Sequence, residues 1–396
     1  MHKRTRHSLM ALPLASLLVL AACGSSSKTD SSSDTAAAGG SDTTAAAAGD
    51  VSLKGICPDN IAIQTDWNPE AEHGFLYQML GADATIDAKK VSVSGKLLAQ
   101  GKDTGVTLEV RSGGPAIGFQ TVTSQLYQDD SILLGYVYTD EGIQNSATFP
   151  TVAIMAPFEK NPQMIMWDPA TYPDVKTIAD LGKDKVLIRY FNGAAYMDYF
   201  TSTGILSKDQ VDGSYDGTPA LFIADQGKSA QQGFGSAEPY QYKNEIKDWG
   251  KDVAYAYIND AGWNNYAEAI ATKPDNVAKY ADCFKKLVPI IQHATVDYMA
   301  DPAATNALIV KAVETFNNGW VYSAGLADYG VATMKKDGLI ANGPDKTLGN
   351  FDLDRVNELI GKAIPVYTAL GQAPKAGLKA EDIVNNDFVD PSIGLP

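Results

Sequence analysis

The chain has 396 residues, 45% of them hydrophobic and 20% charged, and its 32 basic and 47 acidic side chains give a net charge of −15 at pH 7. Residues 51–396 hold more chain than one hydrophobic core usually fills, which predicts two lobes. An acidic surface repels phosphate backbones, so the composition argues against nucleic-acid binding and favours a soluble monomer.

The first 22 residues have the pattern of a bacterial signal peptide. Three basic residues precede an apolar run, residues 9–22, which is shorter than the ~20 residues of a membrane-spanning helix. The run closes with Leu20-Ala21-Ala22-Cys23-Gly24, which resembles the lipobox in which the Cys is diacylated and becomes the new N-terminus. An ordinary secretory signal with an incidental Cys23 is the alternative. Residues 23–50 lack large apolar side chains and are predicted to form a flexible tether after the lipidated Cys.

Strand-like and helix-like patterns alternate along the rest of the chain. Strands or extended segments are predicted at 61–65, 106–110, 132–138, 151–156, 163–167, 185–188, 253–258 and 266–271. Helices are predicted at 73–80, 117–127, 194–203, 275–299, 302–316, 322–335 and 353–370. This alternation predicts an α/β protein whose open sheets are covered by helices on both faces.

Cysteine and histidine usage limits the chemistry. Beyond the leader the chain has two histidines, His73 and His293, and two cysteines, Cys57 and Cys283. No four closely spaced thiolate or imidazole ligands occur, and no nucleotide-binding or hydrolase motif is present, so we expect no metal, no cofactor and no enzyme activity. In an oxidising compartment Cys57 and Cys283 are predicted to form a disulfide, with two buried free thiols as the alternative.

Candidate ligand-binding residues follow the predicted strands, because ligands of open α/β sheets bind beyond the carboxyl ends of the strands. They combine aromatic faces, glycines and a few polar groups. We predict ligand contacts from Asp66, Trp67, Asn68, His73, Ser112, Gly113, Gly114, Arg189, Tyr190, Phe191, Asn192, Gly193, Glu238, Tyr240, Asp260 and Trp263. Simpler roles stay open: Trp67 can pack at a turn, His73 can pack at a helix start, and Arg189 can form an ion pair between lobes.

One motif supports a family resemblance. Asp66-Trp67-x-Pro69-x-x-x-His73, followed by Gly74-Phe75-Leu76-Tyr77, resembles the opening of the NMT1/ThiY-like substrate-binding proteins, solute receptors of bacterial ABC importers related to the sulfonate (SsuA), taurine (TauA) and nitrate binders. The resemblance implies a type II periplasmic-binding-protein fold with two α/β lobes hinged by two crossover strands. Lobe 1 is expected at 51–160 and again, with the C-terminal helices, at 256–396; lobe 2 is expected at 161–255. Residues 82–105 look like an insertion.

The resemblance also implies a function. The protein is expected to be an extracytoplasmic lipoprotein, anchored to the cell membrane, that captures a small molecule by lobe closure and delivers it to an ABC permease. We predict a flat, pyrimidine-like ligand between Trp67 and the Tyr190–Phe191 loop, with its amino groups donating to Asp66 or Glu238. The alternatives are a sulfonate, taurine or nitrate receptor, a pyrimidine-synthase-like enzyme of the same fold, and a tethered scaffold protein without a ligand.

Overall fold

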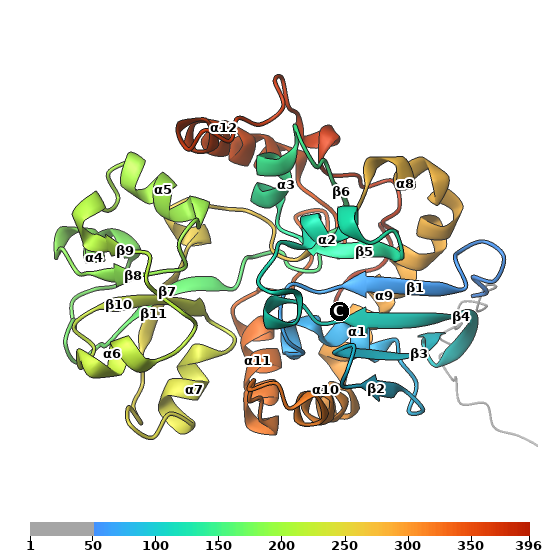
Figure 1. Ribbon diagram of the computed structural model, residues 1–396, viewed down its shortest axis with the longest axis horizontal. Coiled ribbons are helices and arrows are strands. Elements are labelled where there is room, and N and C mark those ends of the chain that lie inside the picture. The colour runs from blue at the N-terminus through green and yellow to red at the C-terminus, as the bar shows by residue number, and fades with distance from the viewer. Residues whose placement is uncertain (1–50) are drawn as a thin grey trace, which may run out of the picture. The chain divides into compact units, whose positions relative to one another are not determined.

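The computed structural model describes residues 51–396 (Figure 1). The predicted signal peptide, the lipidation site Cys23 and the tether to residue 50 lie outside the described residues. Within residues 51–396, no helix is both long and apolar enough to cross a membrane.

The first sheet has seven strands in the order β2-β3-β4-β1-β5-β12-β6. The strands are β1 (Asn60–Gln64), β2 (Thr85–Asp87), β3 (Ser92–Ala99), β4 (Lys102–Arg111), β5 (Ile132–Val137), β6 (Val152–Met155) and β12 (Ala269–Thr272). β1 pairs in parallel with β4 and β5, and β12 is antiparallel to both β5 and β6. The stretch predicted as an insertion forms β2, β3 and the start of β4, which extend the sheet by antiparallel pairing.

The second sheet has five strands in the order β11-β7-β10-β8-β9. They are β7 (Gln163–Trp167), β8 (Ile188–Arg189), β9 (Val211–Asp212), β10 (Ala230–Phe234) and β11 (Ala254–Tyr257). As β1 does in the first sheet, β8 lies between two parallel partners, β9 and β10. β7, which follows β6 of the first sheet along the chain, pairs antiparallel with β10 and β11. We call the parts built on these sheets the first and second lobes. Residues 156–162 and 258–268 are the two crossovers between them.

Helices flank both sheets, and Figure 1 shows α4 to α7 grouped around β7 to β11. The helices are α1 (Gly74–Gln78), α2 (Val122–Gln128), α3 (Thr139–Asn145), α4 (Ile178–Lys183), α5 (Ala195–Ser202), α6 (Ala220–Ala224), α7 (Glu238–Asn244), α8 (Pro274–Lys279), α9 (Ala281–Ala300), α10 (Ala303–Phe316), α11 (Ala324–Lys336) and α12 (Leu353–Ala369). Several starts are capped as the sequence suggests: Thr177 and Asp180 form a capping box, and Asp352 accepts from two backbone N–H groups of α12. The predicted α/β architecture with two sheets is confirmed.

Three predicted elements have different bounds, and one strand was missed. The strand predicted at 185–188 lies at Ile188–Arg189, as β8. The helix predicted at 117–127 begins only at Val122, because Gly118 has a φ of +62° and ends a short 3-10 turn. The helix predicted at 275–299 is broken at Tyr280 into α8 and α9. β10 was missed because two of its five residues, Gln231 and Gln232, are polar. Both are buried and hydrogen-bonded: Gln231 donates to the Tyr242 hydroxyl at 2.8 Å, and Gln232 accepts from Phe191 N at 3.0 Å.

Buried apolar side chains fix the relation of the sheets to the C-terminal helices. α9 packs on α1 and contributes the buried residues Phe284, Leu287 and Ile291 to the main core. Cys57, just before β1, is bonded to Cys283 at the start of α9, with a Cα–Cα distance of 4.8 Å. The segment that precedes β1 is therefore attached both by packing and covalently to a helix 226 residues later.

One side chain of α12 binds both crossovers. The Arg355 guanidinium donates to the carbonyl of Glu159 in the first crossover at 2.7 Å and to that of Asn264 in the second, also at 2.7 Å. It also lies over the Tyr266 ring, 3.8 Å from its centroid. α12 packs in addition against α5 of the second lobe.

Candidate functional site

A cavity of about 690 Å³ lies where the carboxyl ends of β1, β8 and β10 face each other. Its volume is in the usual range for small-molecule sites. Segments of both lobes and the second crossover line it: Asp66, Trp67, Glu70, Glu72, Gln163, Phe191, Asn192, Gly193, Ala194, Tyr215, Gly217, Pro219, Gln232, Gly233, Phe234, Ala237, Glu238, Gln241, Glu245, Ile246, Glu268, Gly319, Trp320 and Val321.

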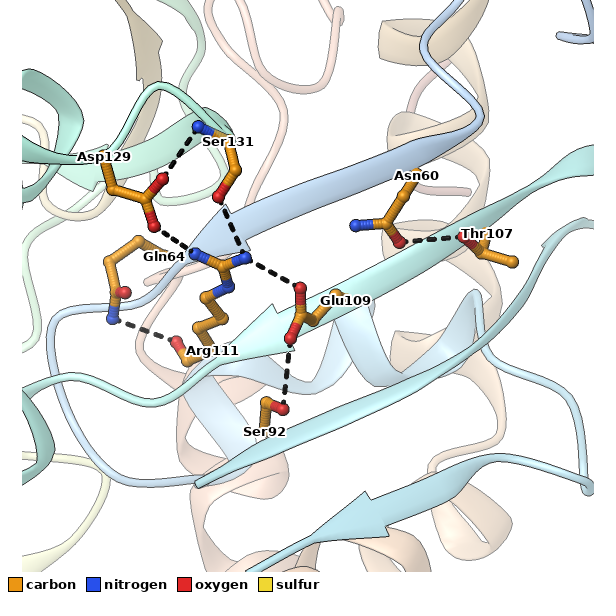
Figure 2. Close-up of polar contacts among 8 residues, drawn as sticks. All are labelled: Asn60, Gln64, Ser92, Thr107, Glu109, Arg111, Asp129 and Ser131. Carbon is orange, nitrogen blue, oxygen red and sulfur yellow. Dashed lines mark hydrogen bonds and ion pairs between the residues drawn. The ribbon is translucent and has the colours of Figure 1, made fainter. Parts of the chain in front are cut away.

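Hydrogen bonds beyond the ends of β1 and β4 hold the loop that carries Asp66 and Trp67. Gln64, the last residue of β1, donates to the carbonyls of Arg111 at 3.2 Å and Ser112 at 2.9 Å. Figure 2 shows that the Arg111 guanidinium is in turn held by Glu109 and Asp129, each at 2.9 Å. The Arg111 side chain is therefore paired with carboxylates outside the cavity lining. The loop that carries Asp66 and Trp67 is held by hydrogen bonds of the protein itself.

Aromatic rings enter the cavity from both lobes. Trp67 lies against Gly114, where an added Cβ would be 2.6 Å from the ring, and its centroid is 6.0 Å from that of Trp320. In the second lobe, the Phe191 and Tyr215 rings lie 4.8 Å apart. The cavity can therefore receive a flat apolar group between ring faces contributed by different lobes.

Six carboxylates line the same cavity: Asp66, Glu70, Glu72, Glu238, Glu245 and Glu268. Within the described part of the chain, the lining includes no Lys or Arg. Burial raises the pKa of Glu238 to about 7 and, together with the neighbouring carboxylates, raises the pKa of Glu70 and Glu268 well above their ordinary values. A nearby cation or hydrogen-bond donor lowers the pKa of such carboxyls again, so cationic or hydrogen-bond-donating groups suit this lining better than anions do.

A histidine lies at the centre of three of these carboxylates. His73 is fully buried, and its Nε2 is 3.3 Å from Asp66 Oδ1, 3.7 Å from Glu70 Oε1 and 3.7 Å from Glu268 Oε2. Among residues 51–396, neither ring nitrogen has a hydrogen-bond partner, and the named oxygens of Asp66 and Glu268 have none either. Imidazole and carboxylate in this arrangement are ligand types that divalent transition metals take.

The structure brings six of the sequence-predicted site residues to the cavity wall: Asp66, Trp67, Phe191, Asn192, Gly193 and Glu238. Four more lie directly behind this wall. His73 contacts Asp66, and Gly113 donates its N–H to the carbonyl of Trp67 at 2.8 Å. Gly114 underlies the Trp67 ring, and buried Ser112 accepts from Gln64. These four support the wall and are not part of it.

Three other predicted site residues, Arg189, Asp260 and Trp263, lie outside the cavity lining. The Arg189 guanidinium donates to Asp225 at 2.6 Å within the second lobe, so neither the ligand role nor the inter-lobe ion pair describes its contacts. Asp260 pairs with Lys160 at 2.8 Å. Trp263 is buried in the hydrophobic core and donates to Asp140 at 3.0 Å.

Three further predicted residues are also engaged outside the lining. Tyr240 packs on Tyr329 with ring centroids 5.5 Å apart. The carbonyl of Tyr190 accepts from the backbone of Tyr215. Asn68 is buried and accepts from the side chain of Asn318 at 2.9 Å.

Several lining residues were not predicted from the sequence. Glu70 and Glu72 occupy unspecified positions inside the motif and were left out of the candidate set, and Glu245 lies just past the end of α7. Trp320 comes from a loop between two helices, where the strand-end rule does not apply. Glu268 offered a signal, because it is an ionisable residue inside the apolar stretch 266–272.

No family model matches the chain, and no curated protein matches it. Among solved structures, it is similar to the periplasmic aliphatic sulphonate-binding protein of Escherichia coli, with 14% identity and a TM-score of 0.54 over 84% of this chain and 94% of that one. It is also similar to the alkanesulfonate-binding protein of Xanthomonas axonopodis pv. citri bound to MOPS, with 13% identity and a TM-score of 0.50 over 83% of this chain and 99% of that one. The chain therefore has the periplasmic-binding-protein fold.

Proposed function

We propose that this protein is the extracytoplasmic solute receptor of a bacterial ABC importer and acts without catalysis. The observation that carries the proposal is the cavity of about 690 Å³ whose walls come from both lobes. A ligand that contacts both walls favours the state in which the walls are close, so binding changes the arrangement that a permease contacts.

The lobes are proposed to rotate about residues 156–162 and 258–268. Polar contacts between the lobes support a closed arrangement in this structure. Ser236 of the second lobe donates to Glu72 of the first, and Tyr257 of the second donates to Asp337 of the first at 2.7 Å. A ligand has to stabilise this arrangement over an open one by its differential affinity.

The ligand class follows from the lining. Six carboxylates and the aromatic rings of both lobes favour a flat molecule with amino or amidine groups, and an aminopyrimidine meets this description. The expected position is against Trp67, as the sequence indicates, but the opposite ring is Phe191 rather than Tyr190. A cationic form of the ligand is favoured over a neutral one because no basic side chain of the described lining competes for the carboxylates.

A sulfonate receptor is the second candidate, because the two solved structures of the same fold are sulfonate-binding proteins. Sulfonate oxygens need several donors converging on them, from Arg, Lys or backbone N–H groups. The carboxylates of this cavity oppose such a ligand electrostatically. We therefore place the amine-bearing heterocycle first.

The mature protein is proposed to be a monomer held at the membrane through a lipid on Cys23, with residues 24–50 as its tether. Diacylation supplies the two-chain anchoring that stable membrane attachment needs. In fractionated cells, Cys23→Ala should move the protein from the membrane fraction to the soluble fraction, and continued membrane retention would contradict the anchor.

A binding panel tests the proposed function. We expect calorimetry to give measurable heats with aminopyrimidines and none with taurine, methanesulfonate or nitrate, and small-angle scattering to give a smaller radius of gyration with the bound compound. Trp67→Ala should weaken binding several-fold, since a stacking partner contributes about 0.5–1.5 kcal/mol beyond burial. Phe149→Ala is the matched control, because this aromatic residue is 47% exposed and lies outside the cavity lining. Tight binding of sulfonates, with amines inert, would replace the first candidate by the second.

A further inference from the structure

Two segments that are distant in sequence, the stretch from Asp66 to His73 and the second crossover with Glu268, bring metal-ligand atoms together at one wall of the cavity. Asp66 follows β1, His73 ends the 3-10 turn before α1, and Glu268 lies in the second crossover just before β12. One ligand atom from each of the three lies within 4.8 Å of the other two. The Glu70 carboxylate lies beside this group of three, with its Oε1 3.7 Å from His73 Nε2.

The spacing of these atoms fits a coordination sphere better than a set of hydrogen bonds. His73 Nε2 lies 3.3, 3.7 and 3.7 Å from the three carboxylate oxygens, and all three distances exceed the 2.7–3.2 Å typical of N–H···O bonds. Ligand atoms about 2.1 Å from a tetrahedral ion lie roughly 3.4 Å from one another. The observed distances bracket that value.

A second observation points to a ligand at the same place. The His73 side chain is 0% exposed, and neither of its nitrogens has a hydrogen-bond partner in the described part of the chain. Asp66 Oδ1 and Glu268 Oε2 are buried and without hydrogen-bond partners as well. Buried polar atoms are nearly always satisfied in native proteins. A single proton on His73 Nε2 can be shared with one carboxylate at a time, whereas a cation between His73, Asp66 and Glu268 satisfies all three side chains together.

We propose that Asp66, His73 and Glu268, with Glu70 as the fourth ligand, form a binding site for one divalent transition-metal ion. One imidazole nitrogen and three carboxylate oxygens suit Zn²⁺, Mn²⁺ or Co²⁺. Four protein ligands are too few for Ca²⁺, which takes six to eight oxygens. Asp66 is 24% exposed and Glu268 1% exposed, so the site opens toward the cavity on its Asp66 side.

This inference stands beside the proposed function and does not depend on it. An ion bound here reduces the negative charge of the wall that faces the second lobe, and it offers the cavity a Lewis-acidic centre that can accept a lone pair from a ligand. The organic ligand and the ion can therefore be tested separately on the same protein.

The test uses the mature chain, stripped with EDTA and dialysed. We expect calorimetry with Zn²⁺ and Mn²⁺ to show one ion per chain, with Mg²⁺ and Ca²⁺ bound at least 100-fold more weakly, and Co²⁺ to give the visible absorption of a low-symmetry site. His73→Gln and Glu268→Gln should each lower Zn²⁺ affinity by at least about 100-fold. Circular dichroism of each variant establishes that it is folded.

Two matched variants control for nonspecific binding. His293→Gln changes the other histidine of residues 51–396, and Glu314→Gln removes an exposed carboxylate of α10; both should retain one ion per chain at unchanged affinity. Absence of transition-metal binding, or Zn²⁺ binding that survives in folded His73→Gln and Glu268→Gln, overturns the proposal. The aminopyrimidine panel, run in EDTA, reports on the proposed function independently of either result.

Discussion

Replacing Glu238 by Gln should remove part of the pH dependence of folding stability. Burial raises the pKa of this carboxyl to about 7 from its ordinary 4.5, despite the bond that it accepts from Phe234 N at 2.7 Å. Between these two values the folded state binds more protons than the unfolded state, so stability falls as pH rises from about 4.5 to about 7 and then levels off. At about 1.4 kcal/mol per pKa unit, the shift corresponds to roughly 3 kcal/mol.

Urea denaturation of the metal-free protein at pH 5, 6, 7 and 8 measures this effect. Relative to wild type, Glu238→Gln should gain stability as pH rises, by an amount approaching 3 kcal/mol at pH 8 and small at pH 5. Glu314→Gln, on an exposed face of α10, is the control and should follow the wild-type profile. Equal pH slopes for wild type and Glu238→Gln would refute the argument that burial controls this carboxyl.

Two further substitutions test features that hold the fold around the cavity. The double change Cys57→Ala, Cys283→Ala opens a covalent loop of 226 residues. On the chain-entropy model it should lower the free energy of unfolding, measured by urea denaturation, by about 5 kcal/mol. A loss below about 1 kcal/mol would contradict that account. Gly114→Ala places a Cβ 2.6 Å from Trp67 at a φ of +54°, so it should lower the free energy of unfolding by about 1–3 kcal/mol and alter tryptophan fluorescence. The control is Gly361→Ala in α12, where, within the described residues, nothing beyond the surrounding helix backbone lies within 4 Å of the added Cβ; it should be neutral or slightly stabilising. Similar effects at both glycines would exclude the clash with Trp67 as the cause.

Much of the fold could be predicted because apolar periodicity marks its central strands. β1, β5 and β7 are runs of buried residues, and each was located to within a residue or two. β10 escaped because its buried Gln231 and Gln232 are polar, and a hydropathy pattern cannot show that Gln231 donates to Tyr242 and that Gln232 accepts from Phe191 N. Short helices such as α3, with Asp140 and Glu141 in its first turn, carry too little periodicity to be recognised.

The candidate site could be predicted only where a residue directly follows a strand. Asp66, Trp67 and Phe191 reach the cavity for that reason. Arg189 follows the predicted strand at 185–188, but in the structure it is the last residue of β8, and its charge is bound by Asp225, a partner 36 residues later that only the tertiary structure identifies. Glu268 lies 195 residues after His73, so no spacing rule connects the two. The expectation of no metal rests on a count of Cys and His, which does not address sites built mainly from carboxylates, and it stays a prediction until ion binding is measured.

The contacts of α12 have a consequence for how cavity occupancy is communicated. Arg355 joins this helix to both crossovers, and farther along it Lys362 donates to the carbonyl of Gly262 at 2.7 Å while the helix packs on α5. If the lobes rotate as proposed, α12 has to shift with the crossovers or lose contacts at one of its ends. Its solvent-exposed side, which includes Glu358 at 58% exposure, then changes position on the outside of the protein. A permease that touches this surface could distinguish a filled receptor from an empty one without any contact with the cargo.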